Sequence, residues 1–197
     1  MKRILNVFVV LAVAIIFSAC NNVPQTEVDA AGVALEQAKT AQADVYFTNE
    51  FFALQDSLNA CIASVEGEKS KSIGNYDQVK AKLQLITDEA TSLTTMTETR
   101  KEEIKTDLAT AQAEISSLLL ENNQLLTTVL KNKDGKDAFE TIRTELEGVN
   151  NTVSELPGLI ENGELLDAQS KINVAKEKAA SINNELKQVI DKNLKKS

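Results

Sequence analysis

Apolar side chains recur along most of this chain at alternating steps of three and four residues, and no other feature constrains its fold as strongly. Steps that average 3.5 residues place side chains along one seam of an α-helix, as in coiled coils. The seam residues are Phe51, Leu54, Leu58, Cys61, Val65, Tyr76, Val79, Leu83, Ile86, Ala90, Leu93, Phe139, Ile142, Leu146, Val149, Val153, Leu156, Leu165, Ala168, Ile172, Ala175, Ala179, Ile182, Leu186 and Val189.

Helix-breaking residues are scarce, since the 197 residues include 7 Gly and 2 Pro. Their positions predict four helices, over 27–66, 75–131, 137–156 and 163–193, with Pro157 ending the third. Threonines at 91–99 weaken the second helix, but nothing there forbids it, so we expect it to be continuous. The expected fold is all-α: an elongated antiparallel bundle of two αα-hairpins, residues 27–133 and 134–197.

The two hairpins also repeat each other in sequence. A shift of 88 residues places the seam that begins at Phe51 on the seam that begins at Phe139. A shift of 89 places Gly74 on Gly163 and the seam from Tyr76 on the seam from Leu165. We interpret this as two hairpins of common design, each with a glycine-containing turn, and a duplication as one origin of the pattern.

The first twenty residues have the layout of a secretory signal. Lys2 and Arg3 precede an apolar stretch over 4–17, and small residues follow before a cysteine. The stretch is too short to span a bilayer as a stable helix. Its end, Phe17-Ser18-Ala19-Cys20, resembles the lipobox of bacterial lipoproteins, with Phe17 where that family prefers Leu.

This resemblance implies that residues 1–19 are removed and that Cys20 carries the lipid, with residues 20–26 as a lipidated N-terminus and short linker. Two or three acyl chains hold a protein stably on a membrane. The expected location is the bacterial cell envelope. Asn21 after the cysteine implies outer-membrane sorting, either periplasmic or surface-exposed, in bacteria that use Asp as the retention signal. An ordinary secretory signal with an incidental cysteine is the alternative.

Charge and composition exclude several functions. The net charge is −8, and removal of Lys2 and Arg3 would make it more negative, so we expect no nucleic-acid partner. The absence of His removes imidazole-based catalysis and imidazole metal sites. No phosphate loop, nucleophile elbow or metal-ligand spacing occurs, so we predict no catalytic residues, no metal, no cofactor and no enzymatic activity.

Four aromatic residues, Tyr46, Phe47, Phe51 and Phe52, lie within seven positions and would surround much of one helix. One interpretation is core packing with one ring partly exposed; the other is a partner-binding patch. Asn122, inside a leucine-rich stretch, is expected to set helix register rather than to bind a ligand. Cys61 on the seam is expected to be a buried core residue.

The predicted function is that of a membrane-anchored, non-enzymatic helical spacer or adaptor that binds a protein partner or itself through coiled-coil faces. The motif Tyr76-x-x-Val79-x-x-Lys82-Leu83 resembles helical lipoprotein domains of unknown function. The alternative is a carrier lipoprotein that holds a small ligand between the hairpins, near Tyr76 and Phe51.

Overall fold

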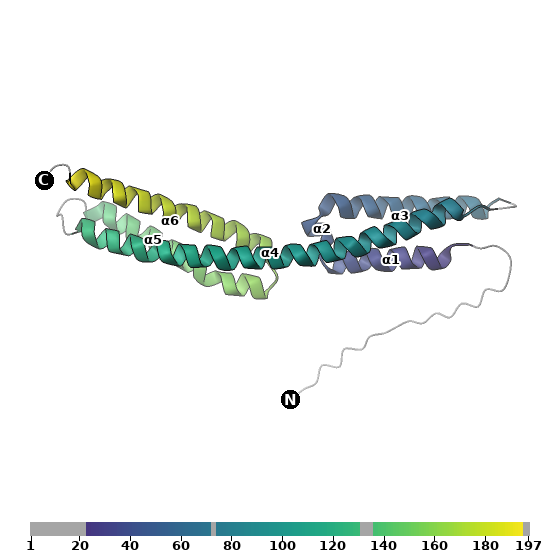
Figure 1. Cartoon of the computed structure of the whole chain (residues 1–197), viewed down its shortest axis with the longest axis horizontal. Coiled ribbons are helices and arrows are strands. Elements are labelled where there is room, and N and C mark those ends of the chain that lie inside the picture. The colour runs from purple at the N-terminus through teal and green to yellow at the C-terminus, as the bar shows by residue number, and fades with distance from the viewer. Residues whose placement is uncertain (1–22, 72–73, 131–135, 195–197) are drawn as a thin grey trace, which may run out of the picture.

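The computed structural model describes residues 23–71, 74–130 and 136–194. These residues form six α-helices: α1 (Gln25–Thr40), α2 (Ala43–Tyr46), α3 (Thr48–Lys69), α4 (Asp77–Leu130), α5 (Lys136–Glu161) and α6 (Leu165–Leu194). The predicted all-α, elongated antiparallel bundle is confirmed (Figure 1).

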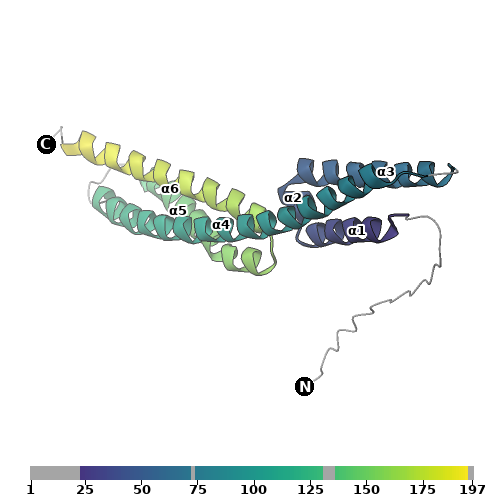
Figure 2. The same ribbon diagram turned by 45° about the vertical axis from the view of Figure 1, so that its right-hand side comes forward.

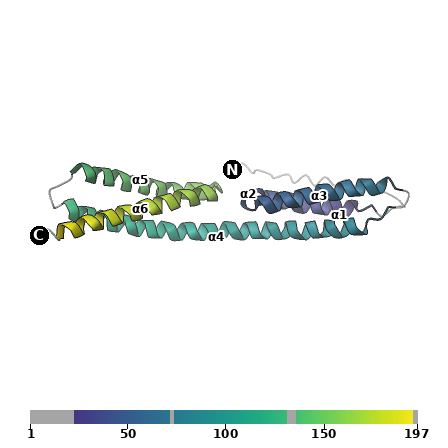
Figure 3. The same ribbon diagram turned by 90° about the horizontal axis from the view of Figure 1, so that it is seen from above.

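The helices form two three-helix bundles that stand end to end and share α4. The first half of α4 packs with α1 and α3, and its second half packs with α5 and α6 (Figures 1 and 3). Among the described residues, no Cα atom of α1, α2 or α3 lies within 8 Å of one in α5 or α6, so α4 is the helix that runs through both bundles. The one-turn helix α2 lies at the junction, as Figure 2 also shows.

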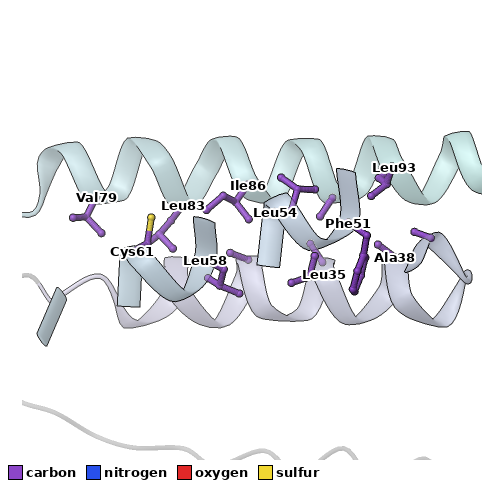
Figure 4. Close-up of a cluster of buried hydrophobic side chains, with 14 of the residues drawn as sticks. Leu35, Ala38, Phe51, Leu54, Leu58, Cys61, Val79, Leu83, Ile86 and Leu93 are labelled. Atoms are coloured by element: carbon purple, nitrogen blue, oxygen red, sulfur yellow. The ribbon is translucent and has the colours of Figure 1, made fainter. Parts of the chain in front are cut away.

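The predicted seams form the core. Seam residues of α3 and α4 face the alanines of α1 in the first bundle (Figure 4). Two further clusters fill the junction and the far end of the second bundle. Small residues on α1, including Ala31 and Ala38 at 0% exposure, let this helix approach its neighbours closely.

The single helix predicted over 27–66 is wrong, because the chain folds back at residues 41–47. Helix α1 ends at Thr40, and Gln42 adopts a left-handed conformation with φ 72°. The N–H groups of Ala41 and Gln42 donate to Gln37 O and Lys39 O, satisfying carbonyls at the end of α1. The reversal lets α1 and α3 both bury their apolar stripes against α4. We infer that this burial outweighs a left-handed residue, which costs about 1–2 kcal/mol.

The predicted continuity of α4 is confirmed over 54 residues. Its threonines satisfy their hydroxyl groups locally, by donating to carbonyls four residues earlier. Thr97 is completely buried and donates to Leu93 O at 2.7 Å. This internal bond allows a threonine to lie on the seam without breaking the helix.

The predicted end of the third helix at Pro157 is also wrong, because α5 continues to Glu161. Proline lacks the N–H that would donate to the carbonyl four residues earlier, and it usually ends or kinks a helix. Here Leu159 and Ile160, which follow it, pack against the second core cluster. Their burial favours another helical turn despite the missing bond.

The internal repeat covers a whole three-helix unit. The shift of 88 that aligns Phe51 with Phe139 also places the start of α3, Thr48, on the start of α5, Lys136. It places Ala34 and Ala38 of α1 on Asn122 and Leu126 of α4, and all four are buried. The second half of α4 therefore plays the part in the second bundle that α1 plays in the first.

The two aligned glycines serve different purposes. Gly163 has φ +78°, a conformation that favours glycine. A Cβ atom at Gly74 would lie 3.0 Å from the ring and the hydroxyl of Tyr76, so Gly74 leaves room for that side chain. Equivalent glycines thus meet a backbone requirement in one bundle and a packing requirement in the other.

Candidate functional site

The predicted lipid-bearing Cys20 and its signal lie outside the described residues. The first described residue, Val23, packs against the core of the first bundle, and α1 begins at Gln25. Glu27 pairs with Lys80 near the start of α4, at 3.7 Å. The chain therefore enters the fold at the outer end of the first bundle, five residues after Cys20.

The fold separates the four predicted aromatic site residues. Phe51 is a core residue at 2% exposure, and Phe47 packs partly buried against the same cluster. Tyr46 packs instead against the cluster at the junction. Phe52 remains 49% exposed, with its ring 5.5 Å from that of Phe51 in an edge-to-face arrangement. Of the four aromatic side chains, only that of Phe52 is largely exposed, near the start of α3.

Tyr46 connects the short helix α2 with the junction segment of α4. The ammonium group of Lys101 lies 5.7 Å from the centre of the Tyr46 ring, a cation–π contact. Burial raises the pKa of the Tyr46 hydroxyl, and the carboxylate of Glu98 adds to this effect. The hydroxyl is therefore neutral at physiological pH. Tyr46 contributes to the junction through the packing of its ring.

A groove of about 650 Å³ runs along the outer side of the first bundle, between α3 and α4. Small residues of α3 form one wall, and longer residues of α4 form the other. The lining includes Ser57, Ala60, Ser64, Glu68, Lys82, Leu85 and Glu89. Sequence reasoning missed this groove, although the small residues beside the α3 seam are visible in the sequence.

Asn122 lies on the seam, as predicted, and is completely buried. Its side-chain Nδ2 donates to Ala179 O of α6 at 2.8 Å, and Asn183 Nδ2 donates to Asn122 Oδ1 at 2.9 Å. Beside them, Lys187 pairs with Glu121 at 2.8 Å and lowers the pKa of the Glu121 carboxyl. This network holds α4 and α6 in one register.

The other reactive groups do not assemble into a site. Cys61 is buried at 5% exposure, as predicted, and is an unpaired thiol. Within the described ranges, no three Cys, Asp or Glu side chains are grouped to hold a metal ion. No helix within those ranges is both long and apolar enough to span a bilayer.

Comparison of the chain with protein-family models, with curated proteins and with solved structures finds no match. Its function is therefore inferred from its own residues.

Proposed function

We propose that this protein is a lipid-anchored, non-enzymatic lipoprotein of the bacterial cell envelope, and that it acts as a rigid helical spacer or adaptor. The observation that carries the proposal is α4, a continuous helix of 54 residues that joins the two bundles end to end. At 1.5 Å per residue its length is about 80 Å. A rod of this kind holds whatever binds to its two ends at a fixed separation, and this function requires no deep pocket.

The position at which α1 begins supports an anchor at one end of the rod. Gln25 begins α1 at the outer end of the first bundle, and the second bundle extends away from it (Figure 1). A lipid on Cys20 would therefore be tied to the first bundle through a very short linker. Because two or three acyl chains bind a membrane stably, such an anchor would hold the first bundle at the bilayer.

The anchor is tested by metabolic labelling with an alkyne analogue of palmitate. We expect label on the full chain, loss of the label in Cys20→Ala, and release of that variant from the membrane fraction. Cys61→Ala is the matched control, because it removes the other cysteine and should leave the label unchanged. Equal labelling of Cys20→Ala and wild type would contradict the proposal.

The adaptor role is tested by photocross-linking in cells from Phe52, the exposed member of the aromatic cluster. A genuine partner should be captured from position 52 and lost when Val45, an exposed residue of the adjoining helix α2, becomes Glu. Val174, an exposed apolar residue of the second bundle, is the control position. Capture of the same proteins from both positions would indicate non-specific contact.

The groove between α3 and α4 favours a second candidate function, that of a small-ligand carrier. Its volume lies within the range of ligand pockets. Tyr76 and Phe51, the residues expected near such a site, are both buried, and neither lines the groove. A ligand from envelope extracts that raises the melting temperature, and fails to do so in Ser64→Trp, would favour the carrier.

A further inference from the structure

The groove between α3 and α4 has an ordered arrangement of small, apolar and charged residues. On α3, Ser57, Ala60 and Ser64 span one heptad, and both serine hydroxyls donate to carbonyls of their own helix. On α4, Lys82, Leu85 and Glu89 span one heptad in the same groove. Leu85 is 55% exposed there. The side chains of the α3 wall are therefore short. On the α4 wall, the apolar side chain of Leu85 lies between the positive charge of Lys82 and the negative charge of Glu89.

In the second bundle an ion pair crosses the equivalent face, between α5 and α6. The repeat places Ser57 on Glu145 and Glu89 on Lys178, and these two residues form an ion pair of 2.5 Å between α5 and α6. It also places Leu85 on Val174, which is exposed as well. The first bundle lacks this ion pair because a serine occupies one of the two positions. No such pair crosses the α3–α4 groove among its described lining residues.

The charges of Lys82 and Glu89 on α4 can pair with the same two residues of a second copy of the chain. In the part of the chain that the structure describes, Lys82 and Glu89 form no ion pair. They lie at equal distances on either side of the midpoint between Leu85 and Ile86. A two-fold axis through that midpoint places Lys82 of one copy opposite Glu89 of the other, twice, with Leu85 near the axis. Small residues on α3 leave room for this approach.

We propose that the α3–α4 groove of the first bundle is a homodimer interface, in which a second copy of this chain packs antiparallel about that axis. The proposal rests on the proposed function, since it specifies how the spacer binds itself. Both charge pairs form only in the antiparallel arrangement; a parallel copy would bring like charges together.

The antiparallel arrangement also suits two chains anchored in one membrane. Glu27 lies beside Lys80, which is five to six residues of α4 from the axis, or roughly 8 Å along the helix. The starts of the two α1 helices therefore lie close together at the centre of the dimer, and the two second bundles extend in opposite directions. Anchoring both copies raises their effective concentration, which favours a small interface.

The test is thiol cross-linking of the full chain in membranes, in a Cys61→Ala background. Leu85→Cys should yield a covalent dimer with a short bis-maleimide. Val174→Cys, at the equivalent and even more exposed position of the second bundle, should not. Cys61→Ala alone reports any reaction at Cys20. Equal dimer yields from positions 85 and 174, or no dimer from position 85, would overturn the proposal.

Charge variants test the antiparallel pairing. Lys82→Glu and Glu89→Lys, each combined with Leu85→Cys, should each lose the dimer band, because like charges then face each other. Differently tagged chains carrying one change each should recover it when mixed, as all-acidic and all-basic surfaces meet. Unchanged dimer in the single variants, or no recovery in the mixture, would overturn the pairing. Palmitate labelling of the same membranes measures lipidation at Cys20 independently of dimer formation. Failure of the lipid anchor and failure of the dimer interface can therefore be told apart.

Discussion

The side-chain amide of Asn183 donates a hydrogen bond of 2.9 Å to Asn122 Oδ1, across the buried contact between α6 and α4. Asn122 in turn donates to a backbone carbonyl of α6, at Ala179. A pair of amides inside a seam of leucine and isoleucine is satisfied in one register only. We infer that this pair fixes the register of the second half of α4 relative to α6.

Asn122→Ala should destabilise the protein by about 1–3 kcal/mol, because it removes the buried oxygen to which Asn183 Nδ2 donates. In a separate cycle, the double variant Asn122→Leu/Asn183→Leu should lose less free energy of unfolding than the two single leucine variants added together. No buried amide then remains unsatisfied. Urea unfolding of the four proteins completes the double-mutant cycle. Additive changes would show that the two side chains act independently.

Tyr46→Ala should loosen the junction between the bundles, whereas Tyr46→Phe should not. The ring, rather than the hydroxyl, contacts Lys101 and the junction cluster, and a cation–π contact alone contributes about 1 kcal/mol. Hydrogen exchange should be faster for amides near Thr97 and Ile104 in the alanine variant. If both variants behave like wild type, Tyr46 does not stabilise the junction.

Gln42→Gly should stabilise the protein, and Gly163→Ala should destabilise it, each by about 1 kcal/mol. Both residues have positive φ, 72° and 78°, and glycine adopts this conformation at little steric cost. Thermal unfolding of the two variants measures the effect, with Gly148→Ala for comparison: this glycine lies inside α5, its new Cβ meets nothing within 4 Å, and the change should stabilise the helix. A lower melting temperature for Gln42→Gly would mean that the fold-back is not strained at that residue.

Stability of the α3–α4 turn should depend on pH through Glu68. Its hydrogen bond with Lys71, and then the N–H of Asn75 at 3.1 Å, hold the pKa of the Glu68 carboxyl below its ordinary value of 4.5. A lowered folded-state pKa stabilises the fold above pH 4.5, and this contribution is lost as the pH falls through the folded value.

Glu68→Gln should therefore lower the melting temperature at pH 7 but have little effect in acid below the folded pKa. Glu66→Gln is the control, because Glu66 pairs with Lys69 on the same helix and accepts no hydrogen bond from those turn residues that the structure describes. A pH-independent difference between Glu68→Gln and wild type would show that this carboxylate does not link stability to pH.

The fold class and most of the core could be predicted because seam spacing is local information. Every seam residue from Tyr76 to Leu93 is buried, and so are Asn122 and Cys61, as expected. Neither the partner of Asn122 nor the groove beside Ser57 could be predicted. Both depend on which helix lies opposite and on the size of side chains distant in the chain.

The sequence by itself determined that this protein is helical, where its seams run and that α4 is continuous, because propensity and 3.5-residue spacing act within a few turns. Only the tertiary structure decided that the chain reverses at Gln42, where no glycine or proline marks a turn, and that α5 passes through Pro157. In both places the burial of neighbouring apolar residues outweighs the local preference of the backbone. That balance depends on contacts between helices, which no local pattern contains.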